Sequence, residues 1–254
     1  MAGHSHSANI KHRKGRVDAA RAKVFSKLAR MVTVAAKLGG PDPDANARLR
    51  LAIDKARMAS MPKDNIERAI KKGAGGMDVG DYEEILYEGY GPCGVAIMLE
   101  ALTDNRNRTA PELRKEFERG GGNLGATGAV AWMFERKGVI AVDPESGADE
   151  DAILEAALLA GAEDLVNLGD GAFEIRCQAG DLETVRAALD AGPIAVQGGE
   201  VRYLPSNQVV LENVDDARKV LKLVESLDDH DDVQSVYANY TISDDIAAQL
   251  EQES

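Results

Sequence analysis

Basic residues gather near the start of the chain, at spacings that suit contact with phosphate groups. Lys11-His12-Arg13-Lys14 and Arg16 come first, and three more cations follow at steps of four and three. Residues three and four apart share one face of a helix. Lys and Arg side chains donate to phosphate oxygens without reading base identity. The candidate nucleic-acid-binding residues of this part are Lys11, His12, Arg13, Lys14, Arg16, Lys23, Lys27 and Arg30.

A second polar cluster is Asp104-Asn105-Arg106-Asn107-Arg108, which we expect to form a loop between a strand and a helix. The guanidinium groups of Arg106 and Arg108 can form paired hydrogen bonds to phosphate or to the edges of RNA bases. Both arginines are therefore candidates for nucleic-acid contact. The alternative is a local turn in which the Asn and Asp side chains bond their own backbone.

Residue patterns typical of enzymes are absent from the sequence. It contains neither a GxSxG nucleophile motif nor a GxxxxGK[ST] phosphate loop. Cys93 and Cys177 lie far apart, so neither a disulfide framework nor a thiolate zinc site is expected. His4 and His6 could share a metal ion, but no carboxylate or thiol lies near them in sequence. We therefore predict a protein that is not an enzyme and that holds no metal or cofactor.

Charge is divided sharply along the chain. Residues 1–76 carry 17 Lys and Arg against 6 Asp and Glu, a net charge of +11, whereas residues 77–254 carry −24. A nucleic acid would be attracted to the first part and repelled by the second. The alternative is that the basic helices dock on the acidic domains of the same chain. Aromatic residues are only 4% of the chain, with Trp132 the single tryptophan, which disfavours a platform of several stacking aromatics.

The cellular compartment is predicted from the absence of membrane-spanning and secretory patterns in the sequence. No run of eighteen apolar residues and no apolar secretory segment is present, and cysteine is rare. We expect a cytoplasmic protein whose partners are nucleic acid and, through the acidic domains, other proteins, but not a membrane.

Three helices are expected in a basic N-terminal domain, residues 1–76, after a polar arm. The first runs from about Arg16 to Leu38. Its apolar stripe consists of Val17, Val24, Leu28, Met31, Ala35 and Leu38. The second is expected to begin at an Asp44 cap, and the third at Pro62.

Strand-like patterns dominate after residue 76. Glu83–Glu88 and Val95–Leu102 are expected as strands, and Ala129–Phe134 as another. Between them, Thr109-Ala110-Pro111-Glu112 has the form of a capping box that would start a helix ending near Arg119.

The remaining pattern predicts an inserted domain. Residues 138–204 alternate as βαββαβ, the order of a ferredoxin-like unit, and carry 14 acidic against 3 basic residues. Elements within 205–240 would complete the α/β domain begun at 77–137, and 241–254 would form an acidic tail, with a short helix as an option. The predicted class is α+β: a helical N-terminal bundle followed by two α/β domains, at least one of them ferredoxin-like.

Several separated blocks of sequence resemble one known family. They are Ala8-Asn9-Ile10-Lys11-His12-Arg13-Lys14, Ala36-Lys37-Leu38-Gly39-Gly40, Tyr87-Glu88-Gly89-Tyr90-Gly91-Pro92, Glu100 to Thr109, Gly121-Gly122-Asn123-Leu124-Gly125 and Trp132-Met133-Phe134. In this order they are similar to the YebC/PmpR family of probable transcriptional regulators, which is related to the mitochondrial translational activator of cytochrome c oxidase. The resemblance covers essentially the whole chain.

The resemblance implies a cytoplasmic three-domain protein that binds DNA and regulates transcription. It equally implies an alternative, a ribosome-associated translation factor that binds ribosomal RNA and assists elongation through proline-rich stretches. Two positions depart from the family pattern. His6-Ser7 stand where the family usually has Lys-Trp, and Cys93 stands where it usually has Gly. A turn that needs a positive φ would be strained by Cys93.

Overall fold

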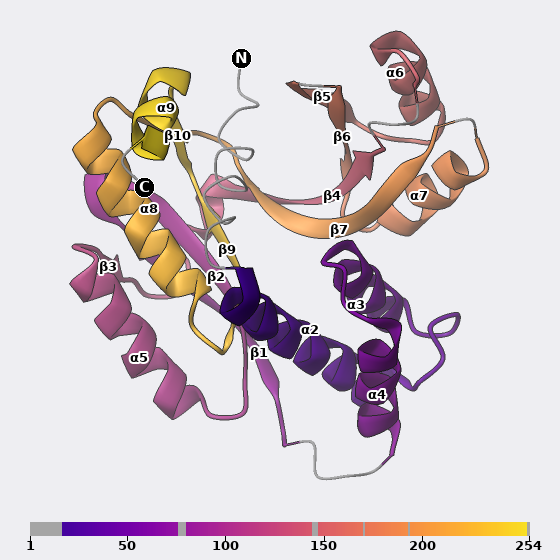
Figure 1. Ribbon diagram of the computed structural model, residues 1–254, viewed down its shortest axis with the longest axis horizontal. Coiled ribbons are helices and arrows are strands. Elements are labelled where there is room, and N and C mark those ends of the chain that lie inside the picture. Colours follow the sequence, from indigo (N-terminus) through magenta and orange to yellow (C-terminus); the bar gives the residue numbers. More distant parts are fainter. Residues whose placement is uncertain (1–16, 76–79, 144–146, 170, 193, 253–254) are drawn as a thin grey trace. The chain divides into compact units, whose positions relative to one another are not determined.

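The computed structural model describes residues 17–75, 80–143, 147–169, 171–192 and 194–252. The chain divides into two compact units. One takes in Gly80–Glu135 and Leu204–Ser254 together with the chain up to Lys23, and the other takes in Val24–Val79 and Arg136–Tyr203. Helices and antiparallel sheets make this an α+β protein, as the sequence predicts (Figure 1). Among the described residues, no helix combines the length and apolar character that a membrane span requires.

The first unit is built on a four-stranded sheet with the order β3-β1-β2-β9. Strands β1 (Glu83–Tyr90) and β2 (Ala96–Thr103) form an antiparallel hairpin in which Tyr87 pairs with Leu99. Strand β3 (Asn123–Leu124) pairs with β1, and β9 (Val233–Ala238) pairs antiparallel with β2. Because β2 is central, every one of its residues except Glu100 is buried.

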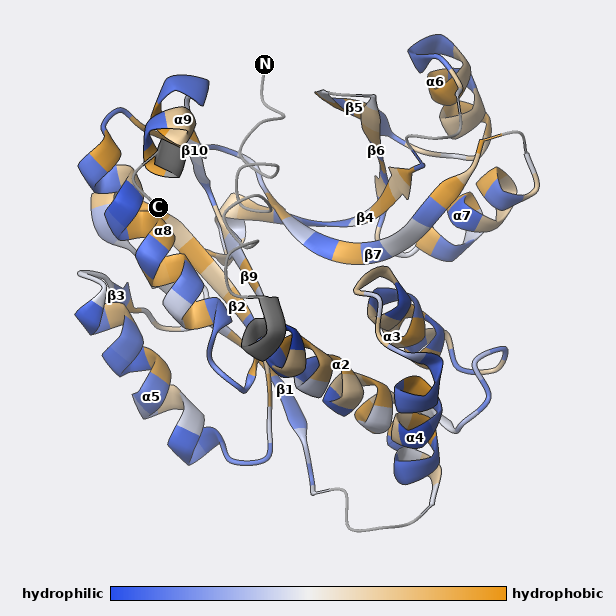
Figure 2. Ribbon diagram, viewed as in Figure 1, coloured by the Kyte–Doolittle hydropathy of each residue, from blue (hydrophilic) through white to orange (hydrophobic). Residues whose placement is uncertain are grey.

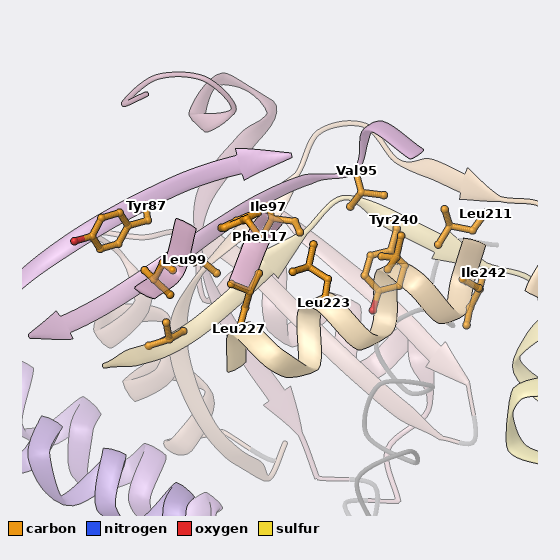
Figure 3. Packing of buried hydrophobic residues seen from close by; sticks show 14 of the residues in the cluster. Tyr87, Val95, Ile97, Leu99, Phe117, Leu211, Leu223, Leu227, Tyr240 and Ile242 are labelled. Carbon is orange, nitrogen blue, oxygen red and sulfur yellow. The ribbon is translucent and has the colours of Figure 1, made fainter. Parts of the chain in front are cut away.

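Helices α5 (Arg106–Arg119) and α8 (Val214–Asp228) supply the core of the first unit. Figure 3 shows Leu223 and Leu227 of α8 lying close to Ile97 and Leu99 of β2 and Phe117 of α5, all almost fully buried. Each such large side chain contributes about 1.5–3 kcal/mol when it leaves water. Along α8, hydrophobic and hydrophilic residues alternate as a helix with one buried face requires (Figure 2).

Helix α5 begins earlier than its predicted capping box. Asn105 is the N-cap, and its side chain accepts a hydrogen bond from the Arg108 N–H. Thr109 is buried, and its hydroxyl bonds Asp232 instead of capping a helix. The prediction of a start at Thr109 is therefore wrong. Asn105, four residues earlier, caps the helix, and Thr109 lies buried within its first turns.

A parallel pair of short strands, β8 (Val209–Leu211) and β10 (Tyr240–Ile242), and helix α9 (Asp244–Gln252) complete the first unit. Ile246 and Leu250 of α9 are buried in the same core. The segment predicted as an acidic tail therefore contains strand β10 and helix α9, the short helix that the sequence allowed, with Asp244 and Asp245 exposed in the first turn of α9.

The second unit contains most of α2 (Val17–Gly39), α3 (Ala47–Met58) and α4 (Lys63–Ala74). Asn46, not the predicted Asp44, caps α3: its side chain accepts from the Leu49 N–H and donates to the carbonyls of Ala35 and Gly40. The predicted apolar stripe on α2 is correct at Leu28 and Ala35, but Val24 and Leu38 are exposed. The spacing of apolar residues shows which face of a helix can be buried. It does not show over what length of the helix other elements pack against that face.

Residues 134–205 form the predicted βαββαβ arrangement. Its antiparallel sheet has the order β5-β6-β4-β7, with two helices packed against its core. The elements are β4 (Phe134–Val142), α6 (Glu150–Leu159), β5 (Asp164–Gly169), β6 (Ala172–Gln178), α7 (Leu182–Asp190) and β7 (Val196–Pro205).

Two single-turn 3-10 helices occur where the sequence suggested other structure. Ala131–Met133 forms η3, so the predicted strand Ala129–Phe134 is wrong: its apolar residues follow a turn, and β4 begins only at Phe134. Pro92–Gly94 forms η2, and within it Cys93 has φ 60° and ψ 16°.

That left-handed conformation costs an L-residue about 1–2 kcal/mol, because its Cβ approaches the backbone. We therefore expect Cys93→Gly to be more stable than Cys93→Ala by about 1 kcal/mol, after allowance for the greater freedom of glycine in the unfolded chain. Urea unfolding followed by circular dichroism measures the difference. The alanine variant is the matched control, because it loses the thiol but keeps the strain. Equal stability of the two variants would contradict this account of the turn.

Candidate nucleic-acid interface

The predicted basic residues fall into two groups. Lys11, His12, Arg13, Lys14 and Arg16 lie outside the described residues. Lys23, Lys27 and Arg30 lie on α2, where their side chains are half-buried and not fully solvated as the helical ridge suggested. The Lys23 ammonium is 3.9 Å from an Asp229 oxygen and 4.0 Å from an Asp231 oxygen. Such loose pairs between exposed groups contribute about 0–1 kcal/mol, so a phosphate could replace these carboxylates.

A set of exposed cations that the sequence had not singled out lies on α4. Arg68, Lys71 and Lys72 are exposed, whereas Ile66, Ala69 and Gly73 face the core. Positions three and four apart on a helix have their Cβ atoms about 5–6 Å from one another. We call Arg68, Lys71 and Lys72 the α4 cationic face. Its sequence signal is the pair Lys71-Lys72, which suits the C-terminus of a helix equally well and so does not by itself point to a ligand.

Close packing against α2 fixes the orientation of this face. A Cβ atom at Gly73 would lie only 2.2 Å from the Thr33 carbonyl oxygen, so only glycine allows the two backbones to approach. The Thr33 hydroxyl also donates to the Ala69 carbonyl at 3.1 Å. Since one side of α4 is held this closely, Lys71 and Lys72 must point to solvent. Lys37, exposed on α2, belongs to the turn of helix nearest this approach.

Cations on α3 have a different role. Arg50 donates to Glu183 at 2.9 Å, Lys55 is 3.3 Å from Glu200, and Arg186 of α7 pairs with Asp54. These pairs join α3 to the acidic domain within the second unit, and Leu51 packs on that domain's core. The alternative of intramolecular docking thus has contacts on α3 and, through Lys23, on α2, while the α4 cationic face remains exposed.

The two arginines of the second cluster also differ in role. Both lie in the first turn of α5 and not in a loop. The Arg108 guanidinium donates to Asp232 at 2.8 Å and to Asp104 at 3.1 Å. Asp232 is only 3% exposed and also accepts from the Thr109 hydroxyl at 2.8 Å. The hydrogen bond and charge of Asp232 raise the pKa of Arg108 above its ordinary value.

Arg108 is therefore a structural residue that neutralises a buried carboxylate, although it is exposed, as Arg106 is. A ligand at Arg108 would have to compete with Asp232 and Asp104, so Arg106 is the stronger candidate of the two. Across the described ranges there is no group of three or more His, Cys, Asp or Glu placed to hold a metal ion.

Two family models match the chain. Residues 5–76 match the TACO1/YebC N-terminal domain, and residues 82–240 match the TACO1/YebC second and third domain. The chain belongs to the TACO1/YebC family. The resemblance inferred from the separated sequence blocks is thereby confirmed.

Curated relatives in the TACO1/YebC family carry the description "probable transcriptional regulatory protein". One from Moorella thermoacetica is 49% identical over 99% of this chain and 100% of its own length. Another, from Trichlorobacter lovleyi, is 53% identical over 96% of this chain and 98% of its own length. A solved structure of a conserved hypothetical protein from Aquifex aeolicus is 46% identical, with a TM-score of 0.81 over 92% of this chain and 96% of the other. The family to which the chain belongs therefore includes proteins described as probable regulators.

The contrast between the two arginines of α5 can be tested by stability. Arg108→Ala leaves the buried Asp232 carboxylate without its charged partner, and we expect a loss of about 2–3 kcal/mol in the free energy of unfolding. Arg106→Ala removes an exposed side chain and should change stability by less than about 0.5 kcal/mol. Urea unfolding of both variants gives the comparison, and equal losses would disprove the structural role of Arg108.

Proposed function

We propose that this chain is a non-enzymatic, cytoplasmic regulator of transcription that binds DNA through its basic N-terminal part. The observation that carries the proposal is the separation of charge: +11 over residues 1–76 against −24 over the rest. The field near a patch, not the total charge, determines what the patch attracts. Phosphate would therefore meet the N-terminal part first.

The exposed cations supply the contacts. Arg68, Lys71 and Lys72 project from one side of α4, and the basic residues Lys11, Arg13 and Lys14 precede α2 in the sequence. Each phosphate neutralised releases counterions, so the binding constant falls steeply with salt. These residue types position a backbone and do not read a sequence.

The acidic part of the chain has a complementary role in the proposal. Residues 138–204 carry a net charge of −11, which keeps nucleic acid away from this domain. Three ion pairs join it to α3, so α3 is not offered to the ligand. The remaining acidic surface is available to protein partners of the regulator.

A second candidate function is a ribosome-associated translation factor that binds ribosomal RNA and assists elongation through proline-rich stretches. The α4 cationic face is compatible with it, since lysine side chains suit phosphate in RNA as well as in DNA. Gradient profiles of lysate at low and high salt, with and without nuclease, separate the two. Salt-sensitive migration with ribosomes supports translation, and nuclease-sensitive retention on DNA away from ribosomes supports transcription.

The proposal predicts which cations matter. Replacing Arg68, Lys71 and Lys72 by Ala should weaken binding to a duplex DNA at moderate salt, and should reduce the slope of log K against log salt by up to about 3. Replacing Lys11, Arg13, Lys14, Lys23 and Lys27 by Ala should have a larger effect of the same kind. Titrations at several salt concentrations measure both.

The matched control removes three cations from the acidic part of the chain: Arg218, Lys219 and Lys222 of α8, each replaced by Ala. It changes total charge as much as the α4 variant does, but should leave the salt slope unchanged. If the α8 variant weakened binding as much as the α4 variant, net charge alone would govern affinity, and the proposed interface would be wrong.

A further inference from the structure

The single tryptophan lies on the surface of the first unit. Trp132 is 70% exposed, although tryptophan is among the side chains that gain most from burial. It belongs to the one-turn helix η3, between the loop that follows β3 and the start of β4. Its neighbours Val130 and Phe134 are buried, so the chain on each side is anchored while the indole is directed outward.

A buried carboxylate holds the loop that carries the tryptophan. Glu88 of β1 is 4% exposed, and its oxygens accept hydrogen bonds from the N–H groups of Gly128 at 2.7 Å and of Val130 and Ala131 at 2.8 Å. Burial by itself raises the pKa of Glu88, but the three amides outweigh it and the pKa lies below its ordinary value. Glu88 is therefore ionised at neutral pH, and it holds the backbone of the turn in place at Gly128, Val130 and Ala131.

The polar edge of the indole is already occupied. Trp132 Nε1 donates to the Ala129 carbonyl at 3.2 Å, and the Tyr90 hydroxyl donates to the same oxygen at 3.1 Å. The ring is thus oriented before any ligand arrives, and its hydrogen-bond donor is used within the turn. What it offers to solvent is the π surface, which recognises a flat partner by stacking.

The residues beside the ring in sequence do not form a wide exposed apolar patch. Trp132 is the one large exposed hydrophobic residue between residues 120 and 137, whereas the buried centre of a protein interface requires a wider apolar patch. The loop beside it, Gly125-Ala126-Thr127-Gly128-Ala129, has only small side chains. Space is also open at Gly128, where an added Cβ would meet no atom within 4 Å.

Exposed carboxylates are few in the sequence around the ring. Residues 120–137 contain Glu135 as the sole carboxylate and Arg136 as an exposed cation, while Lys137 pairs with Glu163 at 2.8 Å. The carboxylate of Glu88 in this turn is buried and bonded by three amides. A phosphate backbone would therefore meet less repulsion at Trp132 than over residues 138–204, which carry a net charge of −11.

We propose that Trp132 is a stacking site for an unpaired nucleobase. Bases in a duplex already stack on one another, so a side chain fixed at a turn reaches a base face only where the strand is single. The inference rests on the proposed nucleic-acid binding and narrows it: the ligand includes a single-stranded stretch, of RNA or of locally opened DNA. Trp132 would hold one base of that stretch by stacking.

The test uses the intrinsic fluorescence of the full chain, in which Trp132 is the only tryptophan. The probes are one mixed-sequence 12-nucleotide RNA, the same sequence as single-stranded DNA, and the corresponding DNA duplex. We expect saturable quenching by the single strands and none by the duplex. Comparison of the affinities for the RNA and for the single-stranded DNA identifies which nucleic acid is preferred.

Three variants test stacking directly. Trp132→Ala should weaken single-strand binding by about 5- to 150-fold, the range found for loss of one stacked base, and should leave duplex binding unchanged. Trp132→Phe keeps a π face and should bind within about threefold of the parent. Trp132→Leu keeps apolar area without a π face and should behave like the alanine variant. Circular dichroism verifies that each variant is folded.

The outcomes separate this inference from the proposed function. Unchanged emission at saturating single strand, or unchanged affinity of Trp132→Ala, overturns the stacking site while salt-dependent binding through the cations still stands. Parent affinity in Trp132→Leu also overturns it, because the contact would then be merely apolar. If the fluorescence were quenched by raising the protein concentration without nucleic acid, Trp132 would contact a second copy of the chain instead of a base. Absence of all binding to the three probes would remove the proposed function itself.

Discussion

The separation of charge between the first 76 residues and the rest is the constraint on which the proposed role of this structure depends. Opposite charges in one chain attract, and an unopposed attraction would cover the cations that a nucleic acid needs. In this structure, α3 makes ion pairs with the acidic domain, and the cations of α4 do not take part in them. Arg50, Lys55 and Asp54 engage the acidic domain, while Arg68, Lys71 and Lys72 of α4 point to solvent. Which helix meets which partner therefore determines whether the basic domain can bind at all.

Two buried carboxylates, Asp232 and Glu88, hold neighbouring segments of the first unit in place. Asp232 is neutralised by Arg108 and bonded by Thr109, which ties the start of α5 to the segment before β9. Glu88 gathers three backbone amides and shapes the turn below Trp132. In each case a charge removed from water is stabilised by the hydrogen bonds that neighbouring groups donate to it. Both carboxylates then act as rigid supports for exposed neighbours, Arg106 in one case and Trp132 in the other.

Much of the architecture follows from sequence pattern. The α+β class, the βαββαβ segment and the helical N-terminal part are read from hydrophobic period, and they are correct because period reflects which face an element buries. Caps are predicted less well. Asp44 and Thr109 both fit the local rules, but Asn46 and Asn105 take those positions because tertiary hydrogen bonds and burial decide among nearby candidates.

The candidate site was harder to read from sequence for a related reason. Arg106 and Arg108 look equivalent two residues apart, and only the fold brings Asp232 to one of them, 124 residues away in the chain. The α2 ridge looks solvated from its spacing, yet its side chains are half-buried. Trp132 was expected in a strand, because its apolar neighbours resemble one. The hydrogen bonds that the backbone N–H groups of this turn donate to Glu88, 40 residues earlier than Gly128, cannot be seen in a local window of sequence.

The measurement that tests the central claim most directly is hydrogen–deuterium exchange of the full chain, free and saturated with nucleic acid at low salt. Binding through the basic part predicts slower exchange in the residues before α2 and in α4, with no change over residues 138–204 apart from their contact with α3. Protection confined to the acidic domain or to α8, with α4 unaffected at saturation, would contradict the account.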